Sequence, residues 1–247
     1  TSASAALAMV SYGARPFVTL TADPGLEAIP QALASGLTVH YDARVARVER
    51  DEAGAAVVLS NGTTVEADRV VLAVPAPAAR ILLADPSPLE GSLLSTPYSS
   101  GLLAVLACRR RLEERELGGA YGLLSSPSQD GPIAALCVAS RAGHAAPGSD
   151  ALTVMFDGRV AERSISVGEP DGEVMTRAVA ALCELAPSLE NAVDREASRV
   201  VRIPAAMPTC RVGRSTQVGR YRSERGGSVI LAGDYLAFPW SDSAALT

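Results

Sequence analysis

The sequence predicts a mixed α/β protein in which parts of a buried parallel sheet are separated along the chain by an antiparallel sheet. Two short runs, 69–74 and 229–232, are rich in Val, Ile, Leu and Ala, which is typical of strands buried on both faces. Between them, strand-like runs alternate with Gly, Pro and Ser loops, a pattern that favours antiparallel pairing. At 247 residues the chain is long enough for one large domain or two interleaved ones.

The C-terminal segment combines a strand, a turn and the start of a helix. Gly233 follows the strand and provides a turn without a Cβ, and Asp234 places a carboxylate at the carboxyl edge of the strand. Ser241-Asp242-Ser243 then opens an Ala-rich segment with N-cap residues. This arrangement suits a polar, phosphorylated ligand, because the carboxylate binds a ribose or ribityl hydroxyl and free N–H groups meet electronegative oxygens. A purely structural strand and turn accounts for the spacing equally well.

The region before the antiparallel sheet contains a helix, a hairpin and the first buried strand. Apolar residues at helical spacing predict a helix over 26–34, with Pro30 in its first turns. Asn61-Gly62 is the strongest hairpin signal in the chain. The other predicted elements are strands at 37–40, 43–50, 55–59, 64–66 and 69–74, a helix at 76–84 and a linker at 86–88.

The middle of the chain predicts a second lobe made of a sheet with covering helices. The predicted elements are strands at 102–108, 121–124, 133–138, 152–156 and 197–203, and a helix at 173–185. One apolar stripe of that helix consists of Val174, Ala178, Ala181 or Leu182, and Leu185, and Pro187 closes the helix.

Charge and residue usage exclude several classes of function. The net charge is −5 and the only basic cluster is Arg109-Arg110-Arg111, so no sustained positive surface is available for nucleic acid. All 22 basic residues are Arg, which excludes a Schiff-base lysine and a P-loop lysine within the chain. Because the four cysteines are scattered and only two histidines occur, we expect no metal site.

The chain contains no candidate transmembrane segment. Its longest apolar tract, 70–84, is interrupted by Pro75, Pro77 and Arg80. No secretory signal precedes the small apolar stretch at 3–10, and the cysteines show no disulfide pattern. These features predict a cytoplasmic location.

The C-terminal segment resembles the FAD signature of the flavin amine oxidase, protoporphyrinogen oxidase and phytoene desaturase superfamily. In that signature a strand ends in Ala-Gly and an acidic residue, and a small-residue helix start follows; here these are Ala232-Gly233-Asp234 and Ser241-Asp242-Ser243-Ala244-Ala245. The resemblance implies that Gly233, Asp234, Ser243 and Ala244 contact FAD, with Asp234 on its ribityl or pyrophosphate part and the amide near Ala244 at the pyrimidine edge of the flavin.

A second stretch carries the same resemblance, from the helix after Pro24 to the strand ending in Pro75. It implies that Val45 meets the adenine through its backbone. The fold implied is part of an FAD-binding Rossmann-like domain interleaved with an antiparallel-sheet substrate domain. The corresponding segments are 1–23, the tail of a preceding segment; 24–84, part of the FAD domain; 85–221, the substrate-binding lobe; and 222–247, the C-terminal part of the FAD domain.

The chain also departs from the pattern of this superfamily. It contains no G-x-G-x-x-G turn, which normally seats the FAD pyrophosphate. Arg214 stands where the family usually has His before the last FAD strand. We therefore expect a fragment or piece of a longer flavoenzyme, with an N-terminal fragment or subunit as the partner that completes the FAD site.

The function implied is that of an FAD-dependent oxidoreductase, which transfers hydride from a C–H bond of a small or apolar substrate to the flavin. A carotenoid- or squalene-type desaturase is the alternative within enzymes, since it uses the same frame. A separated substrate-binding fragment without flavin and without catalysis is the alternative outside them. No residue is nominated as catalytic, because the cofactor carries the chemistry.

Overall fold

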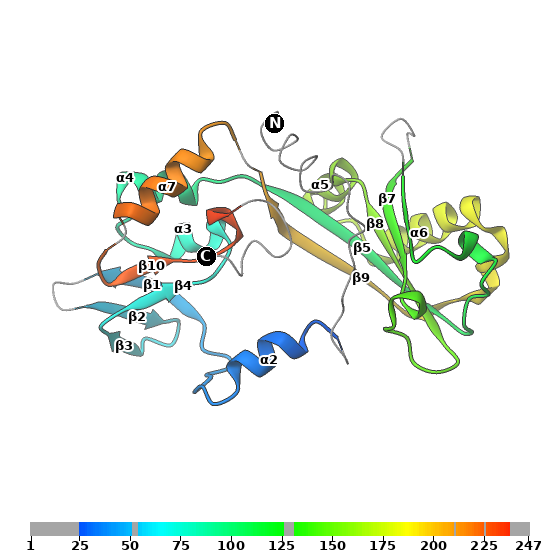
Figure 1. Ribbon diagram of the computed structural model, residues 1–247, viewed down its shortest axis with the longest axis horizontal. Helices are drawn as coiled ribbons and strands as arrows, with labels where there is room; N and C mark the ends of the chain where they lie inside the picture. The colour runs from blue at the N-terminus through cyan, green and yellow to red at the C-terminus, as the bar shows by residue number, and fades with distance from the viewer. Residues whose placement is uncertain (1–24, 51–53, 126–130, 210, 225, 238–247) are drawn as a thin grey trace, which may run out of the picture. The chain divides into compact units, whose positions relative to one another are not determined.

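The computed structural model describes residues 25–50, 54–125, 131–209, 211–224 and 226–237 (Figure 1). These residues form two compact units, and the chain passes between them more than once. Unit 1 contains the described residues of 37–98 and 207–237, and unit 2 contains those of 25–36 and 99–206. Each unit has its own hydrophobic core.

Unit 1 begins with a three-stranded antiparallel sheet of β1 (Val45–Arg50), β2 (Ala55–Leu59) and β3 (Thr64–Ala67). The Asn61-Gly62 turn joins β2 to β3 as expected: Gly62 has a φ of 87°, and the N–H of Thr63 donates to Oδ1 of Asn61 at 3.0 Å. Val48 and Ala55 point from this sheet into the core of the unit. The hairpin prediction is confirmed.

A parallel pair of strands forms the second sheet of unit 1. β4 (Val70–Leu72) and β10 (Val229–Leu231) pair residue for residue although they are far apart in the sequence. The core around them includes the helices α3 (Ala76–Leu82), α4 (Pro88–Leu94) and α7 (Arg214–Glu224). The short 3₁₀ helix η4 (Asp234–Leu236) follows β10 after one turn.

Unit 2 is built on a five-stranded sheet with the order β6-β7-β8-β5-β9. Its strands are β5 (Tyr98–Cys108), β6 (Gly122–Leu124), β7 (Ile133–Val138), β8 (Asp150–Phe156) and β9 (Val193–Pro208). Its helices are α2 (Ala28–Ala34), α5 (Gly158–Ser166) and α6 (Asp171–Leu185), with 3₁₀ turns η1 (Glu116–Gly119), η2 (Ser140–Ala142) and η3 (Pro187–Ala192).

Strand alternation places one face of this sheet in the core. On β5, Leu102, Ala104 and Leu106 are fully buried and pack with residues of α6 such as Val174 and Leu182. The intervening residues of β5 lie on the opposite face and are only half-buried. The predicted stripe of the helix at 173–185 is therefore its buried face, except for the exposed Leu185.

Three predictions about local structure are corrected. Residues 37–40 form no strand; Leu37 is 68 % exposed and Val39 47 %, so the apolar run has no described core to bury against. The linker at 86–88 is instead the start of α4, because Ser87 and Glu90 form a capping box. The helices α5 and α7 were not predicted, since neither has a long apolar stripe.

Candidate functional site

The carboxyl ends of β4 and β10 form the candidate site. The parallel ladder ends where the N–H of Ala232 donates to the carbonyl of Leu72 at 3.0 Å. The chain then turns at Gly233, whose φ of 146° is strained for any residue with a side chain. A Cβ on Gly233 would lie 2.8 Å from Cε1 of Tyr235. Glycine is therefore required for the turn that brings Asp234 to the end of the strand.

Asp234 is half-buried and binds a tyrosine through one oxygen only. The hydroxyl of Tyr98 donates to Oδ1 of Asp234 at 2.5 Å and accepts from the N–H of Ala76 at 3.4 Å. Among the described residues Oδ2 has no hydrogen-bond partner. Burial, and after it the hydrogen bond to Asp234, raise the pKa of Tyr98, so the phenol stays protonated as a donor. As far as the described residues go, one carboxylate oxygen can accept a hydrogen bond from a ligand.

The side chain of Arg214 binds a backbone carbonyl of the same turn. Arg214 is the first residue of α7, and its buried guanidinium donates to the carbonyl of Tyr235 from both Nε, at 3.1 Å, and Nη2. It also donates to Oγ1 of Thr96 and to the carbonyl of Leu93. A planar guanidinium with several donors suits such a cluster of oxygens better than a histidine does. The sequence singled out this position as unusual but gave no role for it.

Two further tyrosines lie in the core around this turn. The hydroxyl of Tyr221 accepts from the N–H of Leu231 in β10 at 2.8 Å. Tyr235 is 1 % exposed, and its hydroxyl has no hydrogen-bond partner in the described part of the chain. Sequence reasoning missed Tyr98, Tyr221 and Tyr235. Of the three, only Tyr235 could have been suspected from the sequence, because it is next to Asp234.

The other residues expected to contact the cofactor are placed as follows. Val45 opens β1, is half-buried against the core of unit 1 and precedes an irregularity in the β1–β2 register. No described contact joins Val45 to Asp234. Ser243 and Ala244 lie outside the described residues. Their assignment, like that of Val45, Gly233 and Asp234, remains a prediction.

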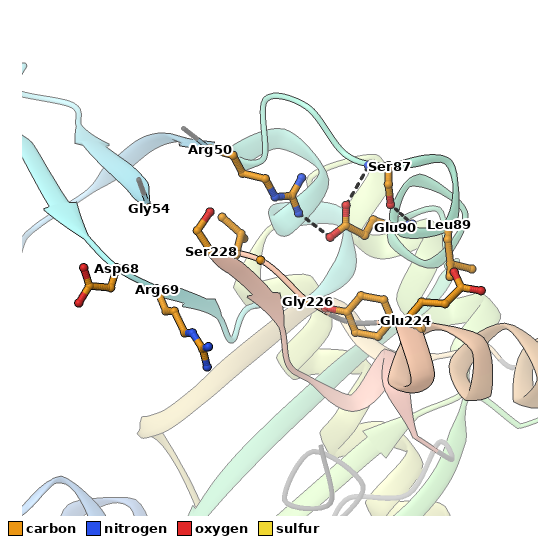
Figure 2. Close-up of a pocket in the computed structure, with 13 residues that line it drawn as sticks. Arg50, Gly54, Asp68, Arg69, Ser87, Leu89, Glu90, Glu224, Gly226 and Ser228 are labelled. Carbon is orange, nitrogen blue, oxygen red and sulfur yellow. Dashed lines mark hydrogen bonds and ion pairs between the residues drawn. The ribbon is translucent and has the colours of Figure 1, made fainter. Parts of the chain in front are cut away.

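A cavity of about 630 Å³ lies at the opposite, amino-terminal ends of the same parallel strands (Figure 2). Asp68 and Arg69 approach it just before β4, and Ser228 just before β10. Figure 2 shows Arg50 pointing toward Glu90, and the two are joined by an ion pair of 2.5 Å. Glu90 also accepts from the N–H of Ser87.

Within this cavity Arg50, Glu90 and Ser87 bind one another and brace the start of α4. Ligands of open α/β sheets bind at the carboxyl ends of the strands. We accordingly place the candidate site at Asp234 and not in this cavity.

A glycine turn and a carboxylate at the end of a parallel strand occur in proteins that bind dinucleotides or flavins. Residues 4–241 match the profile of the flavin containing amine oxidoreductases. The chain belongs to this family. The family resemblance read from the sequence is thus confirmed.

Several solved structures share the fold of this chain. A protein assigned as a protoporphyrinogen oxidase from Exiguobacterium sp. 255-15 aligns over 90 % of this chain with a TM-score of 0.68 and 17 % identity, covering 49 % of its own length. Putrescine oxidase bound to putrescine aligns over 86 % of this chain and 48 % of its own, with a TM-score of 0.62 and 18 % identity. Reduced UDP-galactopyranose mutase aligns over 87 % and 47 %, with a TM-score of 0.63 and 16 % identity.

The chain therefore spans about half the length of the solved structures it matches. No curated protein matches its sequence. The predicted mixed α/β fold class is confirmed by the two units and by these neighbours. Within the described residues, no helix combines the length and the apolarity needed to cross a membrane.

Proposed function

We propose that this chain is part of an FAD-dependent oxidoreductase in which hydride passes from a C–H bond of a small, apolar substrate to the flavin. The observation that carries the proposal is the carboxylate of Asp234, which ends a parallel strand with one oxygen unpartnered among the described residues, in a chain of a flavin-containing family. A carboxylate in this position accepts a hydrogen bond from a ribityl or ribose hydroxyl.

The described residues fit one part of the cofactor. Gly233 gives the turn the close approach it needs, and Oδ2 of Asp234 supplies an acceptor. The glycine-rich turn that binds pyrophosphate is absent from the sequence. This combination supports a site completed by an N-terminal fragment or subunit, with Val45, Ser243 and Ala244 as the further contacts on this chain.

The open face of the unit 2 sheet supports an apolar substrate. Two rows of side chains cross this face, each with one residue from β7, β8 and β5. The rows are Ala135, Met155 and Leu103, and Cys137, Thr153 and Val105. Neither row contains a charged residue, whereas a polyamine requires a carboxylate or an aromatic cage for its cations.

The same observation favours a desaturase acting on an isoprenoid chain as the second candidate. When bound, the flavin supplies the hydride acceptor for either reaction. The protein would hold the substrate on an apolar surface and exclude water. After hydride leaves an isoprenoid chain, a proton must leave the neighbouring carbon, and neither row contains a carboxylate or a histidine to accept it.

The first experiment is a visible absorption spectrum with an intact-mass measurement on the purified chain, followed by titration with FAD. We expect flavin bands, FAD on extraction, and a dissociation constant that rises about tenfold or more in Asp234→Ala, because a hydrogen bond to a charged group is lost. Chromatography of the extract distinguishes FAD from other flavins.

A chain that takes up no FAD, alone or with its N-terminal complement, would support the non-catalytic alternative. Binding that is unaffected by Asp234→Ala would place the cofactor elsewhere. The proposal also includes a cytoplasmic location for the protein. Fractionation of the source cells tests this location.

A further inference from the structure

Tyr98 occupies a position between two groups that the cofactor site depends on. It is the first residue of β5 and belongs to unit 1. Its hydroxyl accepts from the N–H of Ala76, at the start of α3, and donates to Oδ1 of Asp234. One hydroxyl thereby joins the segments that follow β4 and β10, the two parallel strands of the unit.

This hydrogen bond constrains the plane of the Asp234 carboxylate and so the direction in which its second oxygen points. A free carboxylate rotates about its Cβ–Cγ bond, so its two oxygens exchange places. With Oδ1 bound at 2.5 Å, Oδ2 is left as the oxygen without a partner among the described residues. The backbone of the turn is held separately by Arg214, which binds the carbonyl of Tyr235, and Gly233 permits the turn because it has no Cβ.

We propose that Tyr98 is a positioning residue that orients the carboxylate of Asp234 for a ribityl or ribose hydroxyl of the flavin cofactor. The inference rests on the proposed function, in which Asp234 is a cofactor contact. It concerns a side chain that touches Asp234 and Ala76 and acts on the cofactor only through Asp234.

The chemistry of the phenol agrees with this role. Burial and the neighbouring carboxylate raise the pKa of Tyr98, so the hydroxyl remains a donor throughout the neutral range. A hydrogen bond between a hydroxyl and a carboxylate is shorter and stronger than one between neutral groups. Phenylalanine keeps the ring and removes only the donor, so Tyr98→Phe isolates the hydrogen bond.

The first measurement needs no flavin. A proton shared with a carboxylate and shielded from solvent gives a slowly exchanging, downfield hydroxyl resonance in the proton NMR spectrum. We expect it in the wild-type chain and expect its loss in both Tyr98→Phe and Asp234→Ala. Tyr221→Phe is the matched control, because it removes a tyrosine hydroxyl that contacts Leu231 in the same unit. That variant should keep the resonance.

The second measurement is a double-mutant cycle on FAD affinity. We expect Tyr98→Phe to raise the dissociation constant about tenfold in the wild-type background and to have no further effect when Asp234 is already Ala. A purely structural role predicts the same loss in both backgrounds. It also predicts a comparable loss in Tyr221→Phe, which perturbs the same core.

The outcomes separate the two proposals. If Asp234→Ala weakens FAD binding but Tyr98→Phe leaves it unchanged, or if the resonance survives Asp234→Ala, the role of Tyr98 is overturned and the proposed function stands. If Asp234→Ala has no effect on FAD binding, the cofactor contact itself is refuted, and the role of Tyr98 falls with it.

Discussion

Two aspartates, one in each unit, show how the number of hydrogen-bond donors separates a structural carboxylate from one available to a ligand. Asp150 in unit 2 is 5 % exposed and accepts from the N–H groups of Leu112, Ser140 and Ala151 and from the hydroxyl of Ser140. Asp234 in unit 1 is half-buried, and within the described part of the chain its carboxylate accepts from one side chain, Tyr98.

The pKa of Asp150 follows from this saturation. Burial alone would raise it, but the hydrogen bonds from Ser140, Leu112 and Ala151 outweigh burial and lower it. The carboxylate of Asp150 is thus saturated by donors of the protein itself. Its hydrogen bonds connect β8 to the segments that follow β5 and β7. Asp234 keeps acceptor capacity that the described residues do not use.

The largest expected effect on stability is that of Asp150→Ala, and the same substitution at Asp234 is the comparison. Asp150→Ala leaves several buried donors without an acceptor, so we expect it to lower the free energy of unfolding by about 3 kcal/mol. Asp234→Ala removes one hydrogen bond at a half-buried position, and the expected loss is about 1 kcal/mol. Urea denaturation followed by circular dichroism measures both.

Asp150→Asn is the control for the first substitution, since it keeps the shape of the side chain and one of the two acceptor oxygens. It should recover part of the lost stability. Equal losses at Asp150 and Asp234 would remove the distinction between the two carboxylates.

An intermediate effect is expected at the turn that presents Asp234. Gly233→Ala places a Cβ at a φ of 146° and 2.8 Å from the ring of Tyr235. We expect the free energy of unfolding to fall by about 1–3 kcal/mol, because alanine must either adopt this strained backbone conformation or shift the turn. If the turn relaxes, FAD binding weakens as well, although Asp234 is unchanged.

Gly62→Ala is a suitable comparison for this substitution. Gly62 also has a positive φ, of 87°, but a Cβ there meets no atom within 4 Å. It should lose stability without affecting FAD binding. Thermal denaturation and FAD titration of the two variants distinguish backbone strain in general from strain at the site.

The smallest effect should be a pH dependence at a third carboxylate, Glu116 in unit 2. Hydrogen bonds from Arg110, opposed by burial and helped by the N–H of Glu113, lower its pKa from 4.5 to about 2. Because the folded pKa lies below the unfolded one, Glu116 contributes stability above pH 4.5 that is lost as the pH falls toward 2.

Arg110→Gln should reduce this acid sensitivity, seen as a smaller shift of the urea midpoint between pH 5 and pH 3 than in the wild-type chain. The effect is small because solvent screens a pair with an exposed guanidinium. An unchanged pH profile would show that the Arg110–Glu116 pair contributes nothing to stability.

Much of the secondary structure was readable from the sequence. The hairpin at Asn61-Gly62, the strand at 133–138 and the helix near 173–185 are present because turn chemistry and periodicity act locally. The start of α4 was wrongly predicted as a linker, although Ser87 and Glu90 have the spacing of a capping box and could have indicated a helix. The strand predicted at 37–40 is absent, because apolar residues form a strand only where a partner strand and a core exist.

The candidate site, too, was predictable from the sequence only in part. The sequence alone determined the strand, the glycine turn and the position of Asp234, because these are properties of a short segment and of its resemblance to a flavin-binding signature. Only the tertiary structure decided which groups surround that carboxylate. Tyr98 is 136 residues from Asp234 in the chain. Contacts at such separation depend on the packing of a common core, which no local pattern encodes, and they determine whether a buried polar group is saturated or open to a ligand.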